Sequence, residues 1–151
     1  MPTLFTKLNL KDQSPVHVLH APASFEVALT ELAGRIVQRS VTPNDPVTFA
    51  IAFAVTQAEL DAVSATLVAT AIGDAVVWIA YPKQSSRRYR CEFNRDAGWS
   101  VLAAGGFETV RMVAIDEDWS ALRFRRAEYV GTMTRDPARA LTASGKKRTA
   151  T

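Results

Sequence analysis

The sequence has little cysteine and no long apolar run. Its single cysteine, Cys91, excludes an internal disulfide and fits a reducing compartment. The longest apolar runs, residues 49–55 and 75–81, are far shorter than the roughly 20 residues that a membrane helix needs. Lysine and aspartate interrupt the first 16 residues, which therefore contain no secretory apolar stretch. We expect a cytoplasmic protein that does not enter a membrane.

Motifs for phosphate loops and metal ions are also missing. No G-x-x-x-x-G-K segment is present, which excludes a phosphate loop of that type. The only histidines, His17 and His20, are three residues apart in a predicted strand, so they point to opposite faces and do not share a metal ion. The consecutive acids Asp116, Glu117 and Asp118 lack the ligand spacing of a calcium loop. We therefore predict neither a metal ion nor a cofactor.

What the sequence does contain is positive charge in two places. The net charge is +3, although the last 21 residues alone hold five basic residues and one acid. The segment 82–90 (PKQSSRRYR) holds four more basic residues and no acid. Charge from one loop and a tail is weaker evidence for a polyanionic partner than a basic face built into the fold. We expect residues 131–151 to be a disordered basic tail, because they show no apolar periodicity.

The remaining residues show the patterns of alternating strands and helices. Strands are predicted at residues 16–20, 35–39, 47–55, 75–81, 107–115 and 120–127, and helices at 21–34, 56–71 and near 99–104. Thr56 and Glu59 form a predicted capping box at the start of the second helix. The four-residue link 116–119 requires an antiparallel hairpin. Residues 1–15 are predicted to be an extended N-terminal arm, and residues 16–130 a single α/β domain.

Residues 47–127 resemble the second half of the class I S-adenosylmethionine-dependent methyltransferase fold. The resemblance rests on the capped helix after VTFAIAFAV, the strand DAVVWIAYPK, the helix end AAGGF and the hairpin through IDEDWSALRF. Within residues 59–127, AVVWIAYPK, GF and DWSALRF are similar to a bacterial family, the domain of unknown function 3052 group. This implies a three-layer, mostly parallel Rossmann-like sheet of about six strands with an antiparallel hairpin at its C-terminal edge. It implies a fold rather than an activity.

Three departures from the methyltransferase pattern argue against its usual cofactor site. The turn after the first strand reads HAPA at residues 20–23, where the family has a glycine-rich turn, and Pro22 has no amide hydrogen to donate. The second strand ends at Arg39 and Ser40 without the acid that would bind ribose. The turn after the central strand reads AVT at residues 54–56, in place of a catalytic Asn or Asp beside Pro-Pro. We therefore favour a domain that binds a ligand without catalysis.

The strongest candidate site is the basic loop, which we define as residues 82–90. It leaves the carboxyl end of a predicted parallel strand, where open α/β sheets bind ligands. Phosphate or carboxylate groups are expected to bind its charged and hydroxyl side chains, which are Lys83, Ser85, Ser86, Arg87, Arg88 and Arg90. Tyr81 and Tyr89 offer a surface on which a base could stack. The alternative is a solvated loop whose arginines pair with acids of the body.

Other residues carry weaker signals. Cys91 could be a nucleophile only with a base beside it, and a lone cysteine is usually a small buried residue. Arg123, Arg125 and Arg126 make one face of the last strand basic, which discourages edge-to-edge pairing.

The sequence leaves three functions open. They are a non-catalytic domain for a protein partner or small anion, a methyltransferase-like enzyme with an atypical cofactor site, and nucleic-acid binding through loop and tail. A homodimer through the final hairpin also remains possible.

Overall fold

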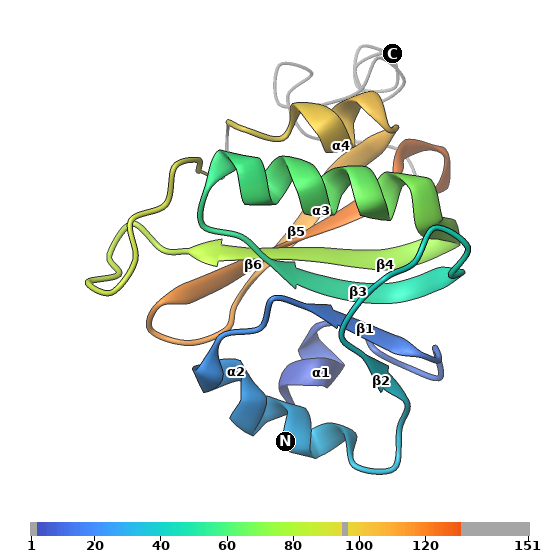
Figure 1. The fold of residues 1–151 in the computed structure, drawn as a ribbon, viewed down its shortest axis with the longest axis horizontal. Helices are drawn as coiled ribbons and strands as arrows, with labels where there is room; N and C mark the ends of the chain where they lie inside the picture. The colour runs from blue at the N-terminus through green and yellow to red at the C-terminus, as the bar shows by residue number, and fades with distance from the viewer. Residues whose placement is uncertain (1–2, 95–96, 131–151) are drawn as a thin grey trace.

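A computed structural model describes residues 3–94 and 97–130, so the predicted basic tail lies outside the described residues (Figure 1). The strands are β1 (Val16–Leu19), β2 (Val37–Gln38), β3 (Val47–Phe53), β4 (Ala71–Pro82), β5 (Phe107–Ala114) and β6 (Trp119–Arg126). The α-helices are α1 (Leu4–Lys7), α2 (Ala23–Ala28), α3 (Gln57–Thr70) and α4 (Ser100–Ala104), and 3₁₀ turns follow at Leu29–Leu32 and Ala127–Tyr129. None of the described helices is long and apolar enough to cross a membrane.

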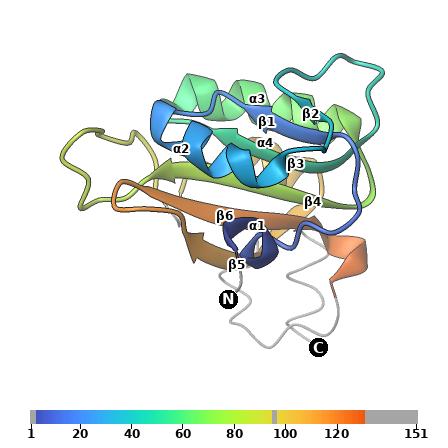
Figure 2. The same cartoon turned by 90° about the horizontal axis from the view of Figure 1, so that it is seen from below.

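The six strands form one mixed sheet in the order β2-β1-β3-β4-β6-β5. Strands β1 to β4 pair in parallel, whereas β6 runs antiparallel to both β4 and β5. Helices α3 and α4 cover one face, and α1 and α2 cover the other (Figures 1 and 2). This confirms the predicted three-layer, mostly parallel α/β fold with an antiparallel pair at one edge.

The predicted capping box at the start of α3 is confirmed. The Thr56 hydroxyl accepts a hydrogen bond from the amide of Glu59, and the Glu59 carboxylate accepts from the amide of Thr56. Leu60, Val63 and Leu67 form the buried stripe of this helix. They pack against β3 and β4, whose side chains are buried on both faces as expected for central parallel strands.

The N-terminal segment differs from the extended arm that we expected. Residues Leu4–Lys7 form one helical turn, which the Thr3 hydroxyl caps. Phe5 and Leu8 are buried in the core, and the indole nitrogen of Trp78 donates a hydrogen bond to the Leu8 carbonyl at 2.7 Å. A single turn is too short to show a periodic pattern, which explains why the sequence gives no sign of it.

Several other boundaries also differ from the prediction, those of α2 and β4 among them. The helix predicted at residues 21–34 begins at Ala23, directly after Pro22, and it tightens into a 3₁₀ turn after Ala28. Strand β4 begins at Ala71, before the expected start at residue 75. Gly73 adopts a φ of +53° within this strand, a conformation that glycine adopts without steric cost.

Candidate functional site

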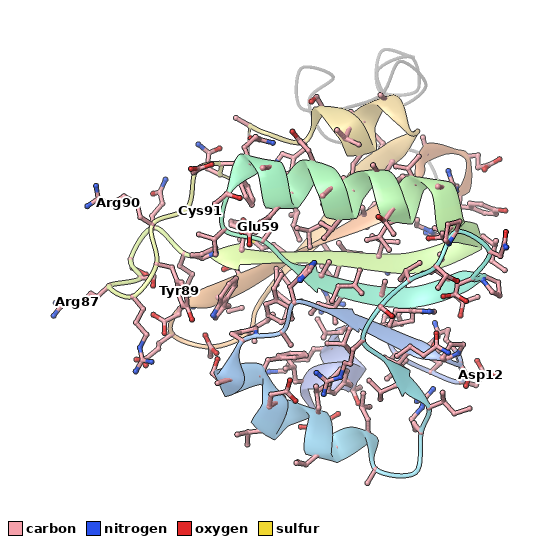
Figure 3. All side chains as sticks on the ribbon, viewed as in Figure 1. Asp12, Glu59, Arg87, Tyr89, Arg90 and Cys91 are labelled. Carbon is pink, nitrogen blue, oxygen red and sulfur yellow. The ribbon has the colours of Figure 1, made fainter. Side chains whose placement is uncertain are left out.

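The basic loop begins at the carboxyl end of β4 and projects from that edge of the sheet (Figure 3). Figure 3 shows Arg87 and Arg90 pointing away from the body, while Tyr89 points back toward the sheet. The Tyr89 ring packs on Trp119, with ring centroids 4.9 Å apart. The loop therefore presents cations outward and anchors itself through an aromatic side chain.

Ser86 organises the backbone of the basic loop. Its hydroxyl donates to the Asp118 carboxylate at 2.9 Å and accepts from the amides of Arg88 and Tyr89 at 3.3 and 3.2 Å. The amide of Lys83 also donates to the carbonyl of Asp118 at 2.8 Å. These contacts join the loop to the turn between β5 and β6. Ser86 thus has a structural role that the sequence does not reveal, because its partner lies 32 positions away.

The basic loop forms one wall of an open cavity of about 850 Å³. Four of the six predicted site residues line this cavity, namely Lys83, Ser85, Ser86 and Arg90. Arg87 and Arg88 are absent from the lining. The cavity is completed by Tyr81, Pro82, Gln84, Tyr89, Cys91, Glu92, Phe93, Asn94, Met112 and Ser120. Met112 and Ser120 come from the closing hairpin, which sequence patterns alone do not place beside the loop.

The cations of the loop differ in their partners. Arg88 approaches Asp118 at 3.6 Å, but its side chain is 74% exposed, so this ion pair contributes little. Within residues 3–94 and 97–130, no side-chain hydrogen bond or ion pair joins Lys83, Arg87 or Arg90 to another residue. Of the arginines in the basic loop, only Arg88 therefore pairs with an acid of the body among the described contacts.

The segment after the loop is fixed to the start of α3. The amide of Glu92 donates to the Val55 carbonyl at 3.0 Å, and the Glu92 carboxylate accepts from the amide of Gln57 at 2.8 Å. Hydrogen bonds from the amides of Thr56 and Val55 hold the pKa of Glu59 below its ordinary value. Both carboxylates lie at the helix N-terminus, where negative charge is stabilised. The cavity wall at residues 91–93 is thus joined to the start of α3 through the backbone and the side chain of Glu92.

Two of the cavity's side chains with a nucleophilic atom, those of Cys91 and Ser86, are poorly suited to that role. Burial raises the pKa of the Cys91 thiol above its ordinary value, although the Phe93 amide opposes the shift. A protonated thiol is a weak nucleophile. The Ser86 hydroxyl already donates to Asp118, a carboxylate that holds it in place rather than a base that faces the cavity.

Aromatic rings fill the carboxyl ends of β1 and β3. The strand order reverses between these two strands, which is where open α/β sheets most often hold a ligand. Phe25 and Phe53 are 1% and 2% exposed there, and their ring centroids are 4.7 Å apart. Phe5 and Trp119 extend this row of rings on either side. The cavity of the basic loop therefore lies beside β4 and β6 rather than at the reversal.

No group of three or more His, Cys, Asp or Glu side chains within the described part of the chain is placed to hold a metal ion. His17 lies inside the sheet and is fully buried, whereas His20 is exposed at the end of β1 with a φ of +59°. The two histidines thus occupy different environments, and His20 lies just beyond β1 rather than within the strand predicted at 16–20.

Comparison with known proteins shows similarity to solved structures at the level of the fold. No family model matches the chain, and no curated protein matches it. Among solved structures, a SAM-dependent methyltransferase from Aquifex aeolicus superposes with a TM-score of 0.53 and 14% identity, over 81% of this chain and 87% of that one. The resemblance to the domain of unknown function 3052 group stays a prediction.

Two further structures are less similar. The fibrillarin pre-rRNA processing protein of Methanococcus jannaschii has a TM-score of 0.45 and 15% identity, over 74% of this chain and 55% of that one. The pyocyanin biosynthetic protein PhzM has a TM-score of 0.44 and 15% identity, over 73% of this chain and 42% of that one. The chain spans about half the length of these two proteins. At such identities the likeness to the Aquifex enzyme identifies a methyltransferase-like fold, without an activity.

Proposed function

We propose that this domain binds a small anionic ligand, with a phosphate or carboxylate group, in the cavity of the basic loop and performs no chemistry on it. The observation that carries this proposal is the cavity of about 850 Å³ lined by Lys83 and Arg90. Neither side chain has a hydrogen-bonding or ion-pair partner among the described residues. Two cations without partners at one cavity favour an anion that pairs with both.

The other lining groups suggest how the ligand is held. Lys83 acts as a point charge near the cavity wall, while Arg90 offers a planar fork of donors from the rim. The hydroxyl of Ser85 adds a neutral donor, and the half-buried Tyr89 offers an aromatic surface beside the cations. These groups suit an anion attached to a small organic body.

A methyltransferase-like enzyme with an atypical cofactor site is the second candidate, and the fold of the Aquifex protein favours it. Against it stand the buried rings of Phe25 and Phe53 at the reversal between β1 and β3. Binding of nucleic acid through loop and tail, a protein partner and a homodimer through the closing hairpin stay predictions of the sequence. We also retain, as proposals, a place in the domain of unknown function 3052 group and a cytoplasmic location.

Calorimetric titration tests the proposed function. Inorganic phosphate and adenosine 5′-monophosphate are the probes, each added to the full chain at constant ionic strength. We expect saturable binding of at least one probe. Lys83→Ala and Arg90→Ala should each weaken it by about 10- to 100-fold, because each removes a charge-assisted hydrogen bond of about 1.5–3 kcal/mol.

Arg87→Ala is the matched control, since it removes the same charge from the same loop outside the cavity lining. It should change affinity by less than threefold at constant ionic strength, as expected for an exposed distant charge. Equal losses in all three variants, or no binding of either probe, would contradict the proposal. Saturable binding of S-adenosylmethionine would instead favour the methyltransferase candidate.

A further inference from the structure

A pair of arginines faces each other across β5 and β6, away from the cavity. Arg111 and Arg123 are direct partners in the antiparallel register of these strands. Directly opposite residues point to the same face, with Cβ atoms about 4.5–5.5 Å apart. Arg123 is also the register partner of Trp78 on β4. The Trp78 indole donates to the Leu8 carbonyl just after α1, so the pair lies on the face that α1 and α2 cover (Figure 2).

The acids on this face are engaged elsewhere. Asp74 binds Arg125 through two hydrogen bonds of 2.7 and 2.6 Å. Glu108 is the register partner of Arg125 and is fully buried. Among the described residues, no hydrogen bond or ion pair joins an acid to Arg111 or Arg123. The face therefore carries two arginines at directly opposite positions, and among the described contacts no carboxylate bridges them.

Arg123 has a donor without an acceptor. Its Nε atom is buried and makes no hydrogen bond with the described part of the chain. A buried donor without a partner is costly, and like charges directly opposite each other destabilise a sheet. Burial, and then the charges of Arg125 and Arg111, lower the pKa of Arg123 from its ordinary value, while Asp74 opposes them. Such an arrangement is unfavourable unless something negative lies between the two side chains.

We propose that Arg111 and Arg123 form a second anion site, which binds a phosphate group independently of the loop cavity. A tetrahedral phosphate has enough oxygen atoms to accept hydrogen bonds from both guanidinium forks, and its larger negative charge offsets two cations better than the single charge of a carboxylate. The exposed Arg111 admits the anion from solvent, and the half-buried Arg123 receives it with the Nε donor that lacks a partner. The same chemistry suits free phosphate and a phosphate carried on a larger molecule.

Nuclear magnetic resonance of arginine side chains tests this site directly. The background is the Lys83→Ala/Arg90→Ala variant, which disables the loop cavity, labelled with ¹⁵N. Inorganic phosphate replaces chloride at constant ionic strength, and the Arg123 Nε–Hε signal is identified by its loss in Arg123→Lys. We expect this signal to shift with saturation, while that of Arg125 moves less, because its Nε already donates to Asp74. O-phosphoserine, used as a second probe, separates free phosphate from a carried group.

Arg111→Ala, made in the same background, should weaken the phosphate-dependent shift at least tenfold. Phosphate should also raise the thermal midpoint of the background variant more than that of Arg111→Ala, since a ligand stabilises the state that binds it. An Arg123 signal that phosphate does not move, or that moves equally in Arg111→Ala, would overturn the site. In that case, stronger self-association of Arg111→Ala would show that the arginine pair instead prevents the edge strand β5 from pairing with another molecule. Because the background lacks both cavity cations, this result is independent of the proposed function.

Discussion

The hydroxyl of Ser86 donates a hydrogen bond to the carboxylate of Asp118, and this contact joins the basic loop to the turn between β5 and β6. Asp118 is held in turn by its own amide, which donates to the Asp116 carboxylate at 2.8 Å. The other oxygen of Asp116 accepts from the Ser24 hydroxyl at the start of α2. A loop rich in cations thus takes its shape from acids that are distant in the sequence.

Ser86→Ala should loosen the basic loop. The substitution removes the donor to Asp118 and the acceptor of two amides, those of Arg88 and Tyr89. We expect faster hydrogen exchange at these two amides and weaker binding of anions in the cavity. The control for the exchange measurement is Ser85→Ala, which removes a neighbouring hydroxyl that makes no such contacts with the described residues. Unchanged exchange in Ser86→Ala would show that the loop is held by other contacts, such as the packing of Tyr89 on Trp119.

Glu59 should stabilise the fold in a manner that depends on pH. Its pKa is lowered from its ordinary value of 4.5, chiefly by hydrogen bonds from the amides of Thr56 and Val55. The ionised carboxylate therefore stabilises the fold above that value, and its contribution is lost as the pH falls through the lowered pKa. Urea unfolding from pH 7 to pH 3 should show that the wild type loses more stability than Glu59→Gln. Parallel curves for the two proteins would contradict this role.

The packing of α4 on α3 requires a residue without a side chain at position 105. A Cβ atom at Gly105 would lie 2.5 and 2.7 Å from the two methyl groups of Val68. Gly105→Ala should therefore cost about 1–3 kcal/mol in unfolding free energy, measured with urea. Val68→Ala removes both methyl groups, so the double variant should be less destabilised than the sum of the two single variants. Strict additivity would indicate that α4 moves away without strain.

His17→Leu should raise the stability of the protein. The imidazole is fully buried, and neither ring nitrogen has a hydrogen-bond partner among residues 3–94 and 97–130. An apolar side chain of similar size removes that unpaired polar group, so we expect a gain of about 1 kcal/mol or more in urea unfolding at pH 8. His20→Asn is the control, because asparagine tolerates the positive φ of this exposed position. A loss of stability in His17→Leu would mean that the ring is hydrogen-bonded in solution.

Local patterns predicted much of the fold. The two-sided apolar runs of β3 and β4, the capping box of α3 and the short link of the hairpin each depend on neighbouring residues, and the structure confirms them. The turn of α1 escaped prediction, because its burial depends on Trp78, 70 positions from Leu8. The cavity was predicted only in part, since Met112 and Ser120 reach it through the pairing of distant strands.

The arginine pair shows a second limit of sequence patterns. Simple alternation along β5 would place Arg111 on the same face as Phe107. A register shift between Thr109 and Arg111 reverses the faces, so that Arg111 joins Arg123. A bulge of this kind leaves no clear mark in the sequence, because it depends on how the partner strand pairs.

The contact between Tyr89 and Trp119 couples the basic loop to the intrinsic fluorescence of a tryptophan. Trp119 is 3% exposed and belongs to the row of rings that ends at the basic loop. Any movement of the loop that displaces Tyr89 changes the surroundings of that indole, and with it the emission and near-ultraviolet dichroism of the protein. Ligand binding in the cavity that moves Tyr89 can therefore be followed by tryptophan emission, without an attached dye.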